Sequence, residues 1–576
     1  MLEQPAQDPK PEWSEQRWRW TAWISALAVA LPSLGLGFFM DDWFALARLR
    51  MEQSWFPDLF RFIHEGRADQ QGPWWTHPQL EMAFWRPLSA LTARIDDTLF
   101  GLHAWGWHLH SVLWFVALLG LAHLAYERLL PGKVGAWAFF AYAIDDVHFL
   151  PVAWLSNRNA LICAVFSLWS ITAYTRDHRP RTGLRALFPF VLALLSGEAG
   201  IEAIGYFAAF ELVSQQPWRE RALRFAPMLA IGIGYLGLRQ SLGYGVRNSA
   251  SYFDPLTDPG TWLTQAPGRF FANFGAFLWT TPLNLWLFHP EARLPLIGAG
   301  VVAVGATLAI LQRAWPTIPT EQRRTLTWLG VGSVLALVPA LSAFPATRLG
   351  TLPAFGSSAL LVVAIDQWRK TKRTEADPGF FLRTSGGILS MNVWSAPLSW
   401  IFHYGVVGWL GTSALTTSLH ADLGGSGVRE VFLVNAPEPS VGLFLPAMRW
   451  VTTGTPPPRY TILSLSPTLR WSRTGPDRFV IEAPEGKALL QSEFERIFGG
   501  EQLELKTGYL MRRGSLSVHI LEADERGPTR VEIKLDRSLD DPSQRFVAWN
   551  GNALVSVTVG QRVPGLLEPA TFPEAP

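Results

Sequence analysis

The chain has 576 residues, of which 49% are hydrophobic and only 17% are charged, and it contains 28 Trp and 36 Phe. Soluble domains usually carry about 25% charged residues, so this composition argues against an ordinary soluble protein. The net charge of +2 and the lack of a basic cluster argue against a nucleic-acid partner, and the single Cys163 excludes an intrachain disulfide.

Apolar runs separated by short basic loops fill the first three quarters of the chain, which is typical of a polytopic helical membrane protein. After a polar tail at 1–19, the uncharged run from Trp20 to Phe39 is long enough to cross a bilayer as a retained helix. Later runs predict helices at 105–125, 134–144, 159–174, 187–195, 199–212, 226–242, 296–311, 326–341, 352–365 and 393–410. We expect residues 20–419 to form one transmembrane domain with a large outer loop at 41–104.

The basic residues between these runs predict an orientation. They gather at 176–185, 219–224, 313–324 and 369–373, and the positive-inside rule places such loops in the cytoplasm. The rule holds for all of them if the segment from Phe271 to Leu287 does not fully cross but is re-entrant or lies along the surface. We therefore expect about eleven spans in a bacterial inner (plasma) membrane, with the N-terminus inside and the C-terminal region outside.

Beyond Leu419 the composition changes to short runs of β-forming residues between Gly, Pro, Asp and Asn. These runs predict strands at 430–434, 460–465, 478–481, 516–521, 531–535 and 554–559. Residues 420–576 should thus form a separate β-rich extracytoplasmic domain. A docking or structural module and a carbohydrate-binding module are the two interpretations of it.

An acidic pair, Asp41-Asp42, directly follows the first apolar run. Two carboxylates at a membrane surface suggest a catalytic acid pair that faces a lipid-carried substrate, whereas the alternative is that Asp42 caps the next helix. Asn is also a good cap, so capping predicts that substitution by Asn is tolerated. The catalytic interpretation predicts loss of activity at normal stability for either aspartate.

Several later stretches occur in the order and spacing of one family: WRPL at 85–88, DDTLFGL at 96–102, WHL at 107–109, DVHFLPVAWLSNRN at 146–159, SGE at 196–198 and RLGTLPAFG at 348–356. They resemble segments of the GT-C membrane glycosyltransferases, most closely the bacterial, TMTC-like branch related to protein O-mannosyltransferases. The similarity covers roughly residues 38–365. Three departures from that branch are Asp145-Asp146 in place of His-Pro, Gly197 in place of Lys, and Phe115 in place of a second His.

The resemblance implies a GT-C-like helical fold and an inverting glycosyltransferase that uses a polyprenyl-phosphate-linked sugar. The acceptor, a protein or a glycan, is not specified by these residues. In this scheme Asp41 or Asp42 is the catalytic base or positions a divalent cation such as Mg²⁺ or Mn²⁺. The expected substrate-binding residues are Arg86, Asp96, His148, Arg158, Glu198 and Arg348, of which Arg348 and Arg158 could hold the phosphate bidentately.

Other functions remain open at this point. A membrane transporter or lipid flippase would use intramembrane acids as a path, but such proteins usually carry an internal repeat, which is not evident here. A degenerate, non-catalytic GT-C scaffold is the third possibility. Trp74-Trp75, Trp85, Trp105 and Trp107 predict an interfacial aromatic belt. The spacing of His64, Glu65 and His77 matches no strong metal site.

The charge argument yields a direct test of topology. A reporter that is active only outside the cytoplasm, fused after Leu419, should give a signal because all basic loops then lie inside. A clear cytoplasmic signal would reverse the map and place Asp41 and Asp42 on the wrong side for extracytoplasmic sugar transfer.

Overall fold

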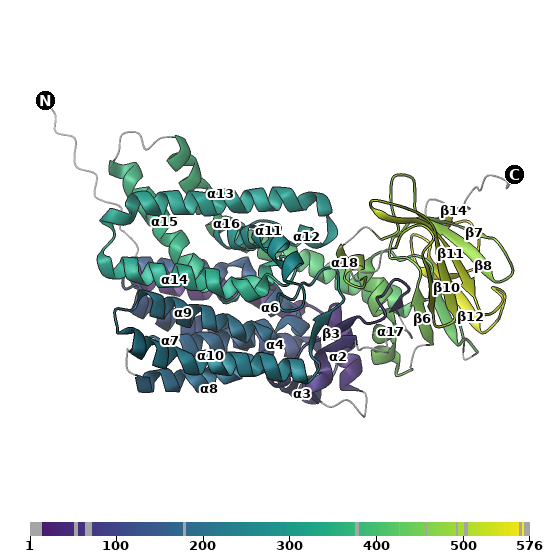
Figure 1. The fold of residues 1–576 in the computed structure, drawn as a ribbon, viewed down its shortest axis with the longest axis horizontal. Helices are drawn as coiled ribbons and strands as arrows, with labels where there is room; N and C mark the ends of the chain where they lie inside the picture. The colour runs from purple at the N-terminus through teal and green to yellow at the C-terminus, as the bar shows by residue number, and fades with distance from the viewer. Residues whose placement is uncertain are drawn as a thin grey trace.

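The structure, a computed structural model, describes residues 14–50, 56–63, 72–176, 180–374, 380–425, 427–455, 458–490, 493–499, 505–563 and 567–568. It has two parts arranged along its long axis (Figure 1). A bundle of long helices occupies one end, and β-sheets occupy the other. Helices α2, α17 and α18 and strand β3 lie at the junction.

Each apolar run predicted as a span is helical over most of its length. The helices are α1 (Glu15–Ala30), α4 (Ala104–Leu129), α5 (Lys133–Ile144), α7 (Asn159–Tyr174), α8 (Pro180–Ser196), α9 (Ala203–Val213), α10 (Trp218–Ser241), α13 (Arg293–Ala314), α14 (Thr320–Ala340), α15 (Ala354–Thr374) and α16 (Phe380–Leu419). The helical-bundle prediction is therefore confirmed.

The number of membrane crossings stays a prediction. By length and composition, two helical segments in the described residues could cross a membrane, Ala104–Leu129 and Pro290–Thr317. A third candidate is the pair Asp146–Ala153 and Leu155–Tyr174, bent by 113° at the break between them. This pair includes the short helix α6 (Phe149–Ala153).

Glycines let neighbouring helices of the bundle approach closely. A Cβ atom on Gly356 of α15 would lie 2.1 Å from the carbonyl oxygen of Leu329 on α14. One on Gly205 of α9 would lie 2.5 Å from the amide nitrogen of Ala336, also on α14. Membrane helices associate through such small residues because lipid supplies no hydrophobic drive between them.

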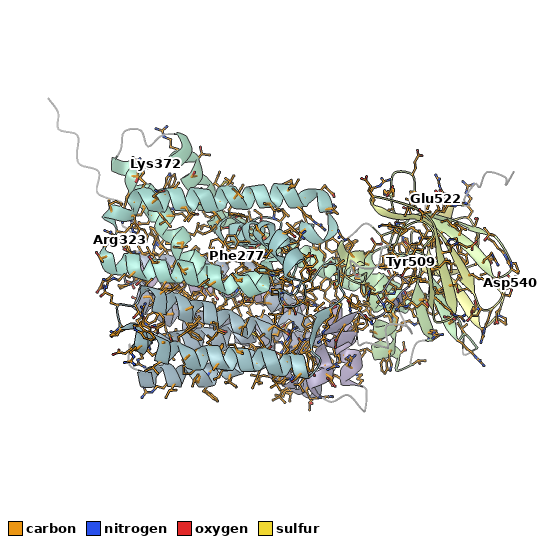
Figure 2. All side chains as sticks on the ribbon, viewed as in Figure 1. Phe277, Arg323, Lys372, Tyr509, Glu522 and Asp540 are labelled. Atoms are coloured by element: carbon orange, nitrogen blue, oxygen red, sulfur yellow. The ribbon has the colours of Figure 1, made fainter. Side chains whose placement is uncertain are left out.

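Basic residues lie at the bundle end that faces away from the sheets. Figure 2 labels Arg323, near the start of α14, and Lys372, near the end of α15, and both are at that end. This arrangement fits the predicted gathering of the basic loops on one side. The side of the membrane on which they lie stays a prediction.

The segment 250–288 leaves the junction, enters the bundle and returns. The amide nitrogen of Ala250 donates to the carbonyl oxygen of Gly499 at 3.0 Å, and the ring of Phe288 stacks on Phe494 with centroids 6.3 Å apart. Between these contacts run α11 (Pro259–Leu278), which packs on α13, and α12 (Leu285–Phe288). The segment thus comes back to its starting end. This path fits the prediction that residues 271–287 do not fully cross, which itself stays a prediction.

The outer loop begins with helix α2 (Asp41–Leu49) and ends with α3 (Pro87–Phe100). Between them, β1 (Arg61–Ile63) and β3 (Glu81–Ala83) join β4 (Gly245–Arg247) in an antiparallel sheet of order β1-β3-β4. This small sheet ties the loop to the end of α10. It carries the chain into Arg86, the residue before α3.

The C-terminal region contains two sheets. One has the order β14-β7-β8-β11-β10-β9 and the other β13-β12-β5-β6-β2. Their C-terminal elements are β5 (Glu430–Leu433), α17 (Pro439–Thr453), β6 (Arg459–Ile462), β7 (Leu469–Arg473), β8 (Arg478–Glu482), α18 (Glu493–Arg496), β9 (Leu510–Arg513), β10 (Leu516–Asp524), β11 (Gly527–Leu535), β12 (Gln544–Trp549), β13 (Leu554–Val557) and β14 (Leu567–Glu568). All the predicted strand segments contain a strand. Helix α17, which connects the parallel strands β5 and β6, was not predicted.

Strand β2 (Gly72–Pro73) comes from the outer loop and pairs in parallel with β6. Hydrogen bonds from the next two residues stabilise this pairing. Trp74 Nε1 donates to Leu463 O at 2.9 Å, and Trp75 Nε1 donates to Glu495 O at 3.0 Å. Both indoles are buried, with exposures of 0% and 1%. The expectation that they form an interfacial belt is wrong, because the C-terminal region covers them. That region is also not structurally separate from the outer loop.

The buried indoles yield a stability prediction. Trp74→Ala should lower the free energy of unfolding by about 3–5 kcal/mol, because it removes a large buried side chain and its hydrogen bond. Trp105, which is 54% exposed, provides the control, and Trp105→Ala should change stability far less. Thermal unfolding of the purified variants in detergent measures both. Equal melting temperatures would contradict the observed docking of the loop.

Candidate active site

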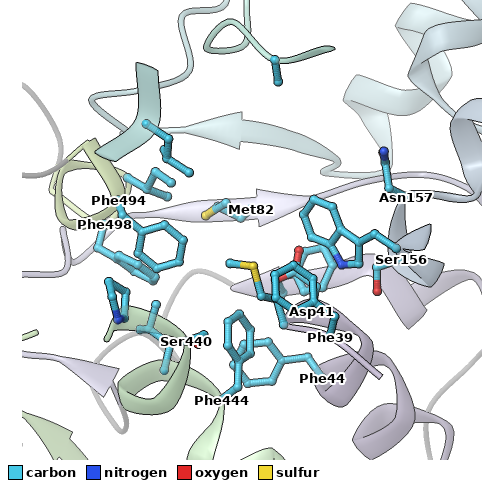
Figure 3. Close-up of a pocket in the computed structure, with 18 of the residues that line it drawn as sticks. Phe39, Asp41, Phe44, Met82, Ser156, Asn157, Ser440, Phe444, Phe494 and Phe498 are labelled. Carbon is cyan, nitrogen blue, oxygen red and sulfur yellow. The ribbon is translucent and has the colours of Figure 1, made fainter. Parts of the chain in front are cut away.

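A cavity of about 970 Å³ lies where the bundle, the outer loop and the C-terminal region meet (Figure 3). Apolar and aromatic side chains form most of its wall, and a few polar groups converge on it, which is the usual composition of a ligand site. Three residues expected from the sequence line it: Asp41, Arg86 and Arg348. Asp41 lies at the centre of the view in Figure 3.

Asp41 is the first residue of α2. The preceding Met40 has a positive φ of 47°, which is rare for a residue other than glycine and turns the chain sharply from the first helical region into α2. Burial and the negative charge of Asp42 raise the pKa of Asp41 to about 7, while Arg348 and Arg86 oppose this rise. Asp41 can therefore exchange a proton near neutral pH.

Asp42 plays a different part from its neighbour. One carboxylate oxygen accepts from the amide of Phe39 at 2.9 Å and the other from the amide of Ser156 at 2.7 Å. Asp42 is only 3% exposed, and burial raises its pKa to about 6 despite these hydrogen bonds. These contacts hold the chain before α2 against the segment after α6, so they differ from the predicted capping of the following helix.

Two guanidinium groups flank Asp41. Arg86 Nε pairs with a Glu198 carboxylate oxygen at 2.9 Å, its Nη1 bonds Asn159 Oδ1 at 3.3 Å, and its plane lies over the ring of Phe84. The Arg348 guanidinium, in the short helix η8 (Thr347–Gly350), lies over the rings of Trp154 and Phe344. Glu198 thus contacts Arg86 and is not among the residues that line the cavity, and its role in substrate binding stays a prediction.

Tyr252 joins this group from the chain before α11. It lines the cavity, and the charge of Arg348 opposes the rise that burial causes in the pKa of its hydroxyl, so the two side chains face each other. Ser156 and Asn157 line the same end of the cavity. Sequence reasoning missed Tyr252 because nothing near it in the chain signals a site, whereas Ser156 and Asn157 lie inside the quoted 146–159 stretch.

Asp96 and Arg158 form a separate buried cluster. They pair with each other, and His110 Nδ1 lies 2.7 Å from the second Asp96 oxygen and 2.9 Å from Arg158 Nη1. Asp96 and Arg158 are 1% and 3% exposed. The structure therefore places Arg158 against a carboxylate and outside the residues that line the cavity, and its role in phosphate binding stays a prediction.

His148 also lies away from the cavity. It is fully buried, its Nε2 lies 2.9 Å from the carbonyl oxygen of Tyr142, and its ring packs on Phe115. Next to it, Asp146 accepts from the Ser399 hydroxyl of α16 at 2.7 Å. The departures from the family pattern at 115 and 146 thus fall at helix contacts.

The residues around Asp41 offer few protein ligands to a divalent cation, and a cation at this site stays a prediction. Both Asp42 oxygens already accept backbone hydrogen bonds, and the next charged groups are the arginines. Within the described residues there is no group of three or more His, Cys, Asp or Glu with metal-binding geometry. His64 and Glu65 lie outside the described residues.

Comparison with known proteins supports the resemblance. No family model matches the chain. It is 30% identical to the human protein O-mannosyl-transferase TMTC2 over 164 residues, which make up 27% of this chain and 19% of that protein. It is 25% identical to the human protein O-mannosyl-transferase TMTC4 over 343 residues, which make up 48% of this chain and 46% of that protein. The matches confirm the predicted resemblance to TMTC-like membrane glycosyltransferases. The chain spans less than half the length of these curated relatives.

Two solved structures are also similar. They are ArnT from Cupriavidus metallidurans in the apo state, with a TM-score of 0.42 over 77% of this chain and 89% of that chain, and the same protein bound to undecaprenyl phosphate, with a TM-score of 0.41 over 90% and 98%. The sequence identity is 13% in both cases.

The contacts of the acid pair revise one expectation. Asp42→Asn should destabilise the fold by about 1–3 kcal/mol, because an amide nitrogen would replace one carboxylate oxygen and leave a buried backbone N–H without its acceptor. Asp41→Asn is the matched control and should keep the wild-type melting temperature. If Asp42→Asn melted like wild type, the two backbone contacts would not be important to the fold.

Proposed function

We propose that this protein is a membrane glycosyltransferase that moves a sugar from a polyprenyl-phosphate donor to an extracytoplasmic acceptor. One observation carries the proposal: Asp41, with a pKa near neutrality, lies in a large, mostly apolar cavity under the charges of Arg86 and Arg348. A base and cations for a leaving phosphate are the groups that such a transfer requires. The names of the curated relatives support the same reaction class.

In the proposed reaction Asp41 is the general base. Its carboxylate takes the proton of the acceptor hydroxyl or amide as the acceptor atom attacks the anomeric carbon of the sugar. The bond from that carbon to the phosphate oxygen breaks, and the electron pair leaves with the polyprenyl phosphate. A single displacement of this kind inverts the anomeric centre. Asp42 supports the reaction by holding the backbone on which Asp41 is placed.

Arg348 and Arg86 stabilise the leaving phosphate in this scheme. Planar guanidinium groups bind phosphate oxygens bidentately, and the charge on those oxygens grows as the bond to the sugar breaks. Glu198 and Asn159 fix the orientation of Arg86 beforehand, which limits the rearrangement needed during the reaction. Such preorganised donors contribute several kcal/mol in other transferases and hydrolases.

The apolar wall fits the lipid part of the donor. Phe402, Val406, Val407 and Leu410 of α16 line one side of the cavity, and Leu285 and Leu287 line another. A polyprenyl chain is apolar, so its burial against these side chains contributes favourably. The phosphate would then lie between this wall and Asp41.

The pKa of Asp41 predicts a pH profile. A general base works in its deprotonated form, so the transfer rate should rise as the pH increases through about 7 and level off above it. Asp41→Asn should reduce transfer by ~10²–10⁴-fold and remove this rise. Transfer assays on purified protein between pH 5.5 and 8.5 test both points. If Asp41→Asn kept full transfer activity, Asp41 would not be the general base.

The role of Arg348 yields a binding prediction. Arg348→Lys should weaken polyprenyl-phosphate binding by about tenfold, since a point charge cannot replace the planar fork, and Arg348→Ala should weaken it further. Arg512→Lys, at an exposed pair with Asp536 in the C-terminal region, is the matched control and should bind normally. Unchanged affinity in a folded Arg348→Ala variant would rule out a phosphate contact.

A further inference from the structure

The C-terminal region supplies a whole wall of the cavity that the proposed chemistry does not use. Its contributions come from α17 and its approach, from strand β6 and from the neighbourhood of α18, and they include Glu438, Ser440, Phe444, Tyr460, Phe494 and Phe498. Figure 3 shows Ser440, Phe444, Phe494 and Phe498 around the space that Asp41 also borders. A purely structural module would need no such wall.

Three polar atoms on this wall are not paired with the rest of the protein, although the Ser440 hydroxyl lies close enough to the Glu438 carboxyl to oppose the rise of its pKa. The Tyr460 hydroxyl, Ser440 Oγ and Glu438 Oε1 are buried atoms with no hydrogen bond of acceptable geometry to any described residue. Tyr460 is 3% exposed and Ser440 is 6% exposed. Buried polar groups are nearly always hydrogen-bonded, because an unpaired one costs free energy, so these atoms require an explanation.

The charges of the two walls differ. The bundle side presents Asp41, Arg86 and Arg348, which suit a phosphate. On the C-terminal side, Arg513 also lines the cavity, but its Nη1 donates to the carbonyl oxygens of Pro73 and Trp74. Burial raises the pKa of Glu438, and the nearby Ser440 hydroxyl opposes this only in part, so the carboxyl is less readily ionised than usual. The hydroxyls of Tyr460 and Ser440 and the weakly acidic carboxyl of Glu438 are groups that suit an uncharged, hydrogen-bonding ligand.

Aromatic rings complete the wall. Phe444 of α17 packs edge-to-face on Phe44 of α2 with centroids 4.9 Å apart, and Phe494 stacks on Phe288. The wall therefore combines aromatic rings with hydroxyls and a carboxyl. A ligand that suits it would carry hydroxyl groups to hydrogen-bond and apolar C–H faces to pack on the rings. Saccharides have this chemistry.

We propose that Glu438, Ser440 and Tyr460 form a subsite for an uncharged saccharide, built by the C-terminal region opposite Asp41. The inference rests on the proposed function, since a saccharide on this wall shares the cavity with the phosphate end of the donor. Two sources have this chemistry: the sugar of the donor and a glycan acceptor. They differ in whether the saccharide is attached to the polyprenyl phosphate.

The first test measures binding of methyl α-mannoside and methyl β-glucoside to the full-length protein in nanodiscs by saturation-transfer NMR. Wild type should bind at least one of them, and Tyr460→Phe and Glu438→Gln should each weaken binding about tenfold. Matched controls are Tyr509→Phe and Glu485→Gln, whose side chains lie outside the cavity wall. The melting temperature of unliganded Tyr460→Phe should not fall, because its hydroxyl loses no protein hydrogen bond.

A second arm separates the two sources. If the wall binds the acceptor, a free glycoside still binds when polyprenyl phosphate saturates the protein. If the wall binds the donor sugar, the same variants should weaken binding of polyprenyl-phosphate mannose and leave binding of bare polyprenyl phosphate unchanged. Either result supports the subsite. The subsite would be overturned if the variants bound both the glycosides and the sugar-bearing lipid with wild-type affinity. A marked fall in the melting temperature of Tyr460→Phe would also overturn it.

Failure of the proposed function would look different. In that case wild type would not bind polyprenyl phosphate, whatever it does with the glycosides. Loss of glycoside binding alone removes the subsite and leaves the transferase proposal standing.

Discussion

The structure depends on one electrostatic arrangement: a half-buried carboxylate, Asp41, at the cavity wall under the influence of Arg86 and Arg348. Burying a charge without compensation is costly, so the site needs these cations to keep the carboxylate near its ionisation point. The cations in turn need support. Glu198 and Asn159 hold Arg86, and aromatic rings flank Arg348. The helices of the bundle bring these residues together from positions far apart in the chain.

A second constraint comes from the junction with the C-terminal region. Strand β2 and the two buried indoles at 74 and 75 fasten the outer loop to β6. Helix α17 packs on α2, the helix that begins with Asp41. The cavity therefore has walls from both parts of the chain. Loss of either part would open the space in which Asp41 is shielded from water, and shielding is what raises its pKa.

Sequence patterns predicted features that depend on local composition. Apolar runs located the helices of the bundle, and β-forming runs located strands in the C-terminal region. Asp41 was also found, from its position directly after the first apolar run, and Arg86 and Arg348 were found from motif resemblance. These signals all lie within short windows, where periodicity and residue type are informative.

Features that depend on distant partners were not predictable in this way. Asp42 bonds the amide of Ser156 across the fold, and its adjacency to Asp41 gave no sign that the two carboxylates point to different partners. Trp74 and Trp75 are of the residue type typical of an interfacial belt, and only the C-terminal region, through the end of β6 and through α18, makes them core residues. Tyr460 and Glu438 reach the cavity because α17 and β6 dock on the outer loop, which no local pattern records.

The most direct test of the central claim is a density map of the protein with a bound polyprenyl-phosphate analogue. The account predicts that the phosphate lies within hydrogen-bonding distance of the Arg348 and Arg86 guanidinium groups, beside Asp41, with the lipid along α16. A phosphate bound elsewhere, with Asp41 facing no ligand, would contradict it.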